Sequence, residues 1–127
     1  MSIAYGPKKI IRAATAGANH VSDDSGDVYC LGRSCDLALY NFASVQLIWS
    51  GITGASTGTL TVEVSDDNVN WDTKMIGAVP MVITISGAAG NDVITTTEVT
   101  ERYYRASWVK VGVTGGTVTA IIMAKGT

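Results

Sequence analysis

The fold of this chain is decided by the stretch Val45-Gln46-Leu47-Ile48-Trp49-Ser50 and its continuation Gly58-Thr59-Leu60-Thr61-Val62-Glu63-Val64-Ser65. In both parts every second residue is large and apolar. Successive side chains of a β-strand point to opposite faces, so this period places one set in a core and the other set outside it. The stretch therefore predicts strands of an antiparallel sheet with one buried face.

The same alternation recurs along most of the chain, separated by Gly-rich or Asp/Asn-rich turns. The predicted strands are Val28–Leu31, Leu37–Phe42, Val45–Ser50, Gly58–Ser65, Trp71–Ile76, Met81–Ser86, Val93–Val99, Tyr103–Val113 and Thr117–Lys125. The loop 51–58 is expected to join two paired strands. Thr114-Gly115-Gly116 is expected to be the turn of a final hairpin, because its glycines admit positive φ. About eight strands at this spacing are typical of a β-sandwich, with a jelly-roll-like arrangement as one form.

Composition supports an all-β domain with little helix. Val, Ile and Thr together supply 40 of the 127 residues, whereas Leu supplies five. Branched side chains suit a pleated surface better than a helix. We expect one β-sandwich domain over residues 28–127. Residues 1–27 are expected to form either a first strand with a loop or an arm that extends onto a neighbouring subunit.

Charge and hydropathy restrict the partners. Nine basic residues stand against eleven acidic ones, and Lys8-Lys9 with Arg12 is the only local basic cluster. This distribution argues against nucleic-acid binding. Apolar runs such as Ala120–Ala124 are too short to span a membrane. The first residues lack the order of a signal peptide, so synthesis in a cytoplasm is expected.

The two cysteines, Cys30 and Cys35, lie in the segment Cys-Leu-Gly-Arg-Ser-Cys. If they flank a tight turn between strands, a disulfide between them is geometrically allowed. In a reducing cytoplasm two free thiols are the expected state. A zinc site would need two further ligands, and His20 is the only histidine.

No set of residues predicts catalysis, and we expect no enzyme and no cofactor. His20 has no nucleophile motif beside it, although a triad needs one. The adjacent carboxylates Asp23-Asp24 and Asp66-Asp67 lie in turn sequences, where Asp is favoured for bonding its own backbone. The Gly-rich loop 51–58 lacks the Gly-Lys-Ser/Thr ending of a phosphate-binding loop.

Two oxygen-rich loops raise the question of calcium. Asp23, Asp24 and Asp27 form the first, and the second spans residues 66–72. Neither has the fixed ligand register of an EF-hand, which closes on a glutamate. We therefore predict polar turns at both places and no metal ligands.

The positions of the three tryptophans bear on whether these side chains pack in the core or form a sugar-binding platform. Trp49 is in phase with Val45 and Leu47, and Trp108 is in phase with Tyr104 and Ala106. Core packing is the expectation for both, and for Trp71, which follows the Asp/Asn turn and is also placed to cap a sheet end. A carbohydrate-binding module used for host attachment remains the alternative function.

Residues Val45–Trp49 and Gly58–Trp71 resemble a pattern of small virion proteins of tailed phages. In that pattern a strand ending near Trp leads to a loop, and a second strand runs into a Ser-x-Asp-Gly-x-x-Trp turn. Arg102–Arg105 and Gly115–Gly126 are similar to the closing hairpin of the same group, so the likeness covers roughly residues 43–126. Asn68 stands where glycine is usual, and asparagine tolerates the left-handed conformation.

The resemblance implies a non-enzymatic structural protein of a phage particle, located in the virion. A capsid decoration or cement protein is the first expectation, and a tail-associated sandwich is the second. The implied partners are further copies of this chain and other virion proteins such as the major capsid protein. Val93–Val99 and the last hairpin carry few charges, and an uncharged exposed strand promotes aggregation unless it is covered. We therefore expect at least one such strand to be buried between subunits.

Overall fold

The computed structural model describes residues 4–21, 30–31, 34–96 and 98–126. The regular structure of these residues is entirely β-strand, without a helix, and every pairing is antiparallel. The prediction of an all-β, antiparallel, sandwich-like fold is confirmed. The strands are β1 (Ala4–Thr15), β2 (His20–Val21), β3 (Cys30–Leu31), β4 (Ser34–Asp36), β5 (Phe42–Ser65), β6 (Asp72–Thr73), β7 (Met75–Ile76), β8 (Val79–Pro80), β9 (Val82–Thr84), β10 (Gly90–Thr96) and β11 (Tyr103–Lys125).

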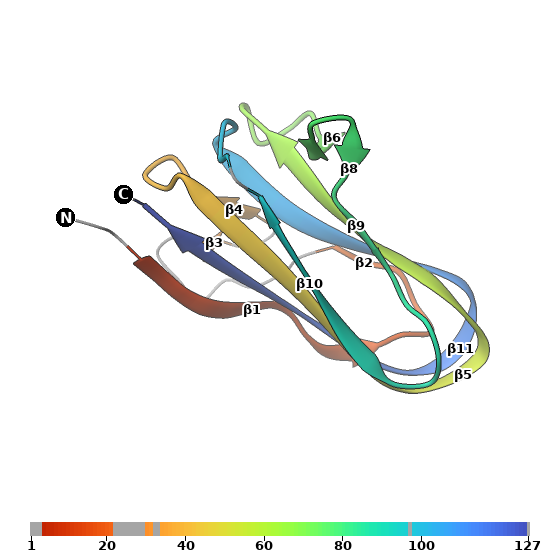
Figure 1. Ribbon diagram of the computed structural model, residues 1–127. Coiled ribbons are helices and arrows are strands. Elements are labelled where there is room, and N and C mark those ends of the chain that lie inside the picture. The colour runs from red at the N-terminus through yellow and green to blue at the C-terminus, as the bar shows by residue number, and fades with distance from the viewer. Residues whose placement is uncertain (1–3, 22–29, 32–33, 97, 127) are drawn as a thin grey trace.

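The two longest strands, β5 and β11, pair with each other from end to end and form one two-stranded ribbon. Their register runs from Phe42 opposite Lys125 at one end to Ser65 opposite Tyr103 at the other. Figure 1 shows this ribbon bending back near its middle, at the end of the molecule remote from both termini. Bending the ribbon produces two layers from a single sheet.

Glycines make the bend. The register of the ribbon shifts at several points between Val111 and Thr117. Four glycines beside these shifts have positive φ: Gly51 (63°), Gly54 (80°), Gly112 (76°) and Gly116 (105°). Glycine adopts such angles without a Cβ clash, and bulges bend and twist a strand. Both strands therefore turn the corner while the ladder continues.

This arrangement corrects two predictions. The loop 51–58 does not join two strands that pair with each other, and Thr114-Gly115-Gly116 is not a hairpin turn. Residues 42–50 pair with 117–125 of β11, and residues 58–65 pair with 103–110. The same glycine signal fits a tight hairpin and a bent strand, and only the distant pairing partner distinguishes them.

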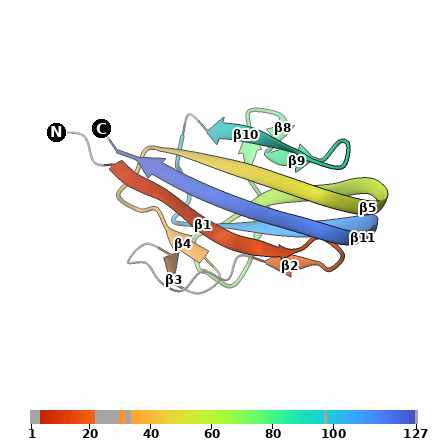
Figure 2. The same cartoon turned by 90° about the horizontal axis from the view of Figure 1, so that it is seen from below.

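The two layers share β5 and β11. Layer A contains β10, residues 42–50 of β5, residues 117–125 of β11, and β1, in that order. Layer B contains residues 58–65 of β5 and 103–110 of β11, flanked by β6 and β9 on one side and by β4 and β2 on the other. Figure 2 shows β1, β11 and β5 of layer A side by side.

The core lies between the layers and contains the alternating residues that the sequence assigned to it. Leu47, Trp49, Leu60 and Trp108 are among its members, and all are buried. Each of these tryptophans lies against a glycine. A Cβ on Gly58 would lie 2.3 Å from Trp108 Cη2, and one on Gly90 would lie 2.7 Å from Trp49 Cζ2. Contacts this close leave no room for any larger residue.

Several predicted boundaries differ from the structure. Leu37–Phe42 is mostly a turn, closed by the Tyr40 N–H donating to the Leu37 carbonyl at 3.0 Å. The strand expected at Val93–Val99 begins earlier, at Gly90, because the turn before it is shorter than predicted. The small β7–β8 hairpin was not predicted, and the described residues hold eleven strands rather than about eight.

The N-terminal strand belongs to the same sheet as the rest of the chain. β1 pairs with the last half of β11, from Ala4 opposite Lys125 to Thr15 opposite Thr117. β2 pairs with β11 at Ser107 and Trp108. The expected domain boundary at residue 27, and the polar turn before it, lie outside the described residues.

The expectation of two free thiols is wrong. No cysteine in the described part of the chain is free, and Cys35 is disulfide-bonded and buried. The β3–β4 ladder places Cys30 directly opposite Cys35. Opposite residues of an antiparallel pair have Cα atoms about 4.5–5.5 Å apart, within the range that a disulfide requires.

Candidate functional site

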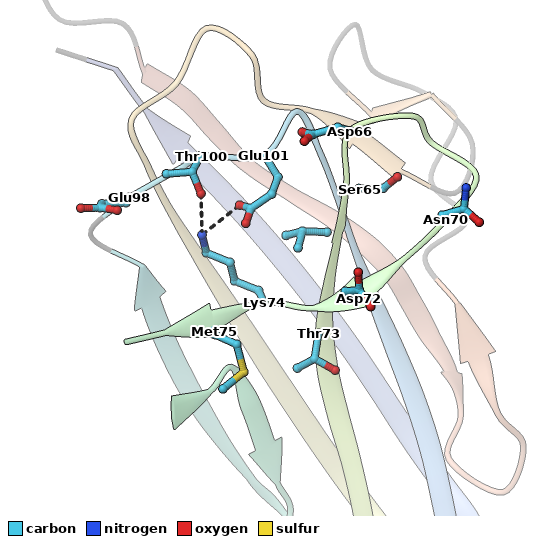
Figure 3. A pocket seen from close by; sticks show the side chains of 11 residues that line it. Ser65, Asp66, Asn70, Asp72, Thr73, Lys74, Met75, Glu98, Thr100 and Glu101 are labelled. Carbon is cyan, nitrogen blue, oxygen red and sulfur yellow. Dashed lines mark hydrogen bonds and ion pairs between the residues drawn. The ribbon is translucent and has the colours of Figure 1, made fainter. Parts of the chain in front are cut away.

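A polar pocket opens at the end of layer B where β5 leaves the sheet. Its volume is about 370 Å³. The end of β5, the turn after it, β6, and the segment that leads into β11 form its walls (Figure 3). The lining residues are Val64, Ser65, Asp66, Asn70, Asp72, Thr73, Lys74, Met75, Glu98, Thr100 and Glu101.

Lys74 is the central residue of this pocket, and only 5% of its side chain is exposed. Its Nζ donates to Glu101 Oε1 at 2.9 Å and to Thr100 Oγ1 at 3.3 Å, as Figure 3 shows. The backbone of Lys74 is fixed as well, because its N–H donates to the Val62 carbonyl at 2.8 Å and its carbonyl accepts from Met81 N–H at 2.8 Å. A buried ammonium needs a counter-charge and hydrogen bonds, and here it has both.

Glu101 also accepts a hydrogen bond from the hydroxyl of Tyr104, at 3.0 Å. Burial alone would raise the pKa of Glu101, but hydrogen bonds from Lys74, Thr100 and Tyr104 outweigh it and hold the pKa below its usual value. Burial, with the charge of Glu101 and its hydrogen bond, raises the pKa of Tyr104. The cluster is therefore a neutral phenol, a carboxylate and an ammonium that satisfy one another.

The turn after β5 uses its carboxylate for its own backbone. Asp67 Oδ1 accepts from Ser65 Oγ at 2.8 Å, from Val69 N–H at 2.9 Å and from Asn70 N–H at 2.8 Å, and Oδ2 accepts from Asn70 Nδ2 at 2.7 Å. Hydrogen bonds from Asn70 and Val69 are the main reason that the pKa of Asp67 lies well below its ordinary value. The prediction of a self-bonded turn is confirmed here. Asn68 has a φ of 61°, the left-handed conformation inferred for it.

The remaining residues that the sequence offers as metal ligands form no ligand set in the described part of the chain. Asp23, Asp24 and Asp27 lie outside the described residues. In the part of the chain that is described, no three His, Cys, Asp or Glu side chains gather as a metal ligand set. His20 lies on β2, away from the pocket, and its Nε2–H donates to the Thr15 carbonyl at 2.7 Å.

The three tryptophans do not share one role. Trp49 and Trp108 are core residues, as predicted, and their Nε1–H groups donate to the carbonyls of Ser86 at 3.3 Å and Ala16 at 3.2 Å. Trp71 is not in the core and is half-buried. The guanidinium of Arg105 lies 4.2 Å from the centroid of its ring, which is a cation–π contact.

A second candidate site is the outer face of layer A. Its rows run from β10 across β5 to β11: Thr95–Ser44–Met123, Val93–Gln46–Ile121 and Asn91–Ile48–Thr119. Four large apolar side chains on the exterior of layer A are substantially exposed, namely Val93 (50%), Met123 (42%), Ile48 (39%) and Phe42 (36%). None of the residues in these rows is charged. We call these nine residues the uncharged face; Phe42 borders it, at the point where it is opposite the exposed Lys125.

Lys74 is the site residue that sequence reasoning missed. It lies in a segment assigned as an ordinary strand, and its partner Glu101 is distant in sequence. No local signal marked it, because Lys74 lies opposite Val62 only through the pairing of β6 with β5. That register is visible only in the folded chain.

No family model matches the chain, and no curated protein matches it in sequence. Among solved structures, it is similar to the SPBc2 prophage-derived protein YomS, with a TM-score of 0.54 and 10% identity over 98% of this chain and 95% of that one. It is also aligned with BiXyn10A CBM1 in its apo form, with a TM-score of 0.35 and 8% identity over 100% and 96% of the two chains. The first likeness is one of fold, and the second is too low to carry an argument. None of the described residues forms a helix of the length and apolarity needed to cross a membrane.

Proposed function

We propose that this protein is a non-enzymatic structural component of a phage particle, and that it decorates the capsid shell through protein–protein contacts. The observation that carries the proposal is the uncharged face of layer A. Monomeric proteins seldom leave large apolar side chains grouped on a flat sheet, and such faces mark contact surfaces. The fold likeness to a prophage-derived protein supports the choice of a phage particle.

The occupant that we propose for the uncharged face is a second copy of this chain. The three strands that carry the rows are about 4.8 Å apart and about nine residues long at about 3.4 Å per residue, so their footprint is on the order of 400 Å². A standard interface buries about 800 Å² on each partner. Since the rows hold no charge, two copies can meet over them without repulsion, with Lys125 and Lys9 at the margins of the contact. Closed pairs of this kind suit a protein present in many symmetric copies.

The polar pocket supports a structural role better than a catalytic one. Its lysine and glutamate are paired with each other, and the tyrosine hydroxyl donates to the same carboxylate oxygen. An activated nucleophile or base needs a group held ready for substrate. The hydrogen bonds of Lys74 to Thr100 and Glu101 instead join the residue after β6 to the segment before β11, so we assign the pocket to holding these two segments together.

Quantitative mass spectrometry of purified phage particles tests the location. Hundreds of copies in each particle are expected for a decoration protein, whereas a few to a few dozen would indicate the tail. Complete absence from particles would overturn the proposal. In that case the carbohydrate-binding alternative would depend, among the tryptophans, on Trp71, because the other two are buried. Titration of Trp fluorescence with glycans would test it.

Sedimentation velocity tests the occupant of the uncharged face. We expect Ile48→Lys combined with Met123→Lys to abolish self-association, because a buried unpaired charge opposes the contact. A matched control places Lys at Thr61 and Ser107, which are cross-strand neighbours on the outer face of layer B. If wild-type protein stays monomeric at high concentration, face-to-face pairing is excluded.

A further inference from the structure

The edge of layer A formed by β10 is open. β10 pairs with β5 and with no other strand in the described part of the chain. Its seven residues keep a continuous register without a bulge. A straight edge of this length presents unpaired N–H and C=O groups and is a template for a further strand.

The direction of these backbone groups follows from the ladder. Each residue of an antiparallel strand points both its backbone N–H and its C=O at one neighbouring strand, and the next residue points both at the strand on the other side. Ala16 N–H donates to the Gly116 carbonyl, so even positions in this half of β11 face β1 and odd positions face β5. By the same rule, even positions in this half of β5 face β11 and odd positions face β10. Asp92 therefore turns its backbone groups to its partner Leu47 on β5, and the next residue, Val93, turns its N–H to the open edge.

That N–H is already occupied by the side chain of the preceding residue. Asp92 Oδ1 accepts from Val93 N–H at 2.9 Å. Asp92 is opposite Leu47, which is fully buried, so its side chain leaves the strand on the core side of layer A although it is exposed. An inward-pointing charge on an edge strand is a known obstacle to strand addition.

The other edge of layer A differs from this one. β1 shifts its register three times against β11, and Pro7 within it has no N–H to donate. Bulges and proline both disfavour the addition of a strand. β10 has neither, so Asp92 is the feature that distinguishes it from a freely extendable edge.

We propose that Asp92 keeps β10 from pairing with β10 of a second copy of this chain. Two identical edges that meet antiparallel each bring an Asp92, and like charges at adjacent cross-strand positions repel. The partner carbonyl must also displace Asp92 from the Val93 N–H. Association is thereby directed to the uncharged face. Only this last consequence rests on the proposed function, because closure of the edge holds for a monomer too.

The experiment compares Asp92→Val with wild type and with Asp72→Val, which removes an equal charge from an exposed position on the two-residue strand β6. Sedimentation equilibrium measures the association constant, and hydrogen exchange reads the amide of Val93. For Asp92→Val we expect an association constant at least about tenfold higher than for wild type. The Val93 amide should become protected as concentration rises, and Asp72→Val should change neither measurement.

An association constant and a Val93 exchange rate equal to those of wild type, in folded Asp92→Val, would overturn the inference. Asp92→Asn covers the case in which the valine variant does not fold, since asparagine keeps an acceptor for the Val93 N–H and removes only the charge. It should associate more strongly than wild type, and unchanged association would overturn the inference as well. Both variants carry an intact uncharged face, so the Ile48 and Met123 variants test the proposed function separately.

Discussion

The outer faces of layers A and B come from the two halves of the same two strands, yet they differ in kind. On layer B the pair Arg105–Glu63 bridges β11 and β5 at 2.9 Å, and Arg105 also stacks on Trp71. On layer A the corresponding rows hold Ser, Thr, Asn, Gln and apolar residues. The inward positions of both halves are alike because one core selects them. The outward positions are not fixed by the core, so the two faces are free to differ.

The largest expected effect comes from breaking the bend that creates the two faces. Gly54→Ala should lower the free energy of unfolding by about 3–5 kcal/mol, because positive φ strains alanine and the added methyl meets the backbone. A Cβ there would lie 2.5 Å from the Gly112 carbonyl oxygen. Urea denaturation measures the loss.

Gly77→Ala is the matched control for this prediction. Its φ is also positive, at 63°, but a Cβ there meets nothing within 4 Å. It should lose only about 1 kcal/mol, the cost of the backbone conformation alone. Equal losses in the two variants would show that the close approach of β5 and β11 at the bend contributes nothing.

The next effect concerns the polar pocket at the end of layer B. Glu101→Gln leaves the Lys74 ammonium buried without its counter-charge, which should reduce stability by about 2–4 kcal/mol. Glu63→Gln removes the carboxylate from the cross-strand pair with Arg105, whose side chain is 21% exposed against 5% for Lys74, and should reduce stability by less than about 1 kcal/mol. Thermal unfolding at neutral pH compares the two, and a larger loss for Glu63→Gln would reverse the assignment.

Acid should weaken the pocket before the uncharged face. Because the folded pKa of Glu101 lies below the ordinary glutamate value of 4.5, its contribution is complete above that value and is lost as the pH falls through the folded pKa. The free energy of unfolding should therefore decline below about pH 4.5. The decline should be smaller in Glu101→Gln, as denaturant titrations at pH 7, 5 and 3.5 would show. An identical pH dependence of the free energy of unfolding in both proteins would exclude a contribution of ionised Glu101 to stability.

The smallest effect is expected on the uncharged face itself. Ile48→Lys should change monomer stability by less than about 0.5 kcal/mol, since the side chain points outward and makes few fold contacts. At the adjacent position, Leu47→Ala should lose about 2–4 kcal/mol, because it removes a fully buried side chain. A large loss for Ile48→Lys in a demonstrated monomer would mean that this face serves the fold rather than a partner.

Much of the core could be predicted because each buried position follows from a local period. Alternation alone places Leu47, Trp49, Leu60 and Trp108 in the core, and all four are buried. The self-bonded turn at Asp67 was also predictable, since its partners lie within three residues. The pocket was not predictable, because Lys74 and Glu101 meet only after β6 and β11 have both joined the sheet.

The sequence by itself determined an all-β chain, the side chains that face inward, and the turn after β5. These follow from a two-residue period and from short-range hydrogen bonds, which operate within a few residues. Only the tertiary structure decided that two expected hairpins are one bent ribbon. It also set Cys30 opposite Cys35 and left β10 as an open edge beside Asp92. Pairing partners are chosen between strands far apart in sequence, and glycines that permit positive φ fit a hairpin and a bend equally well.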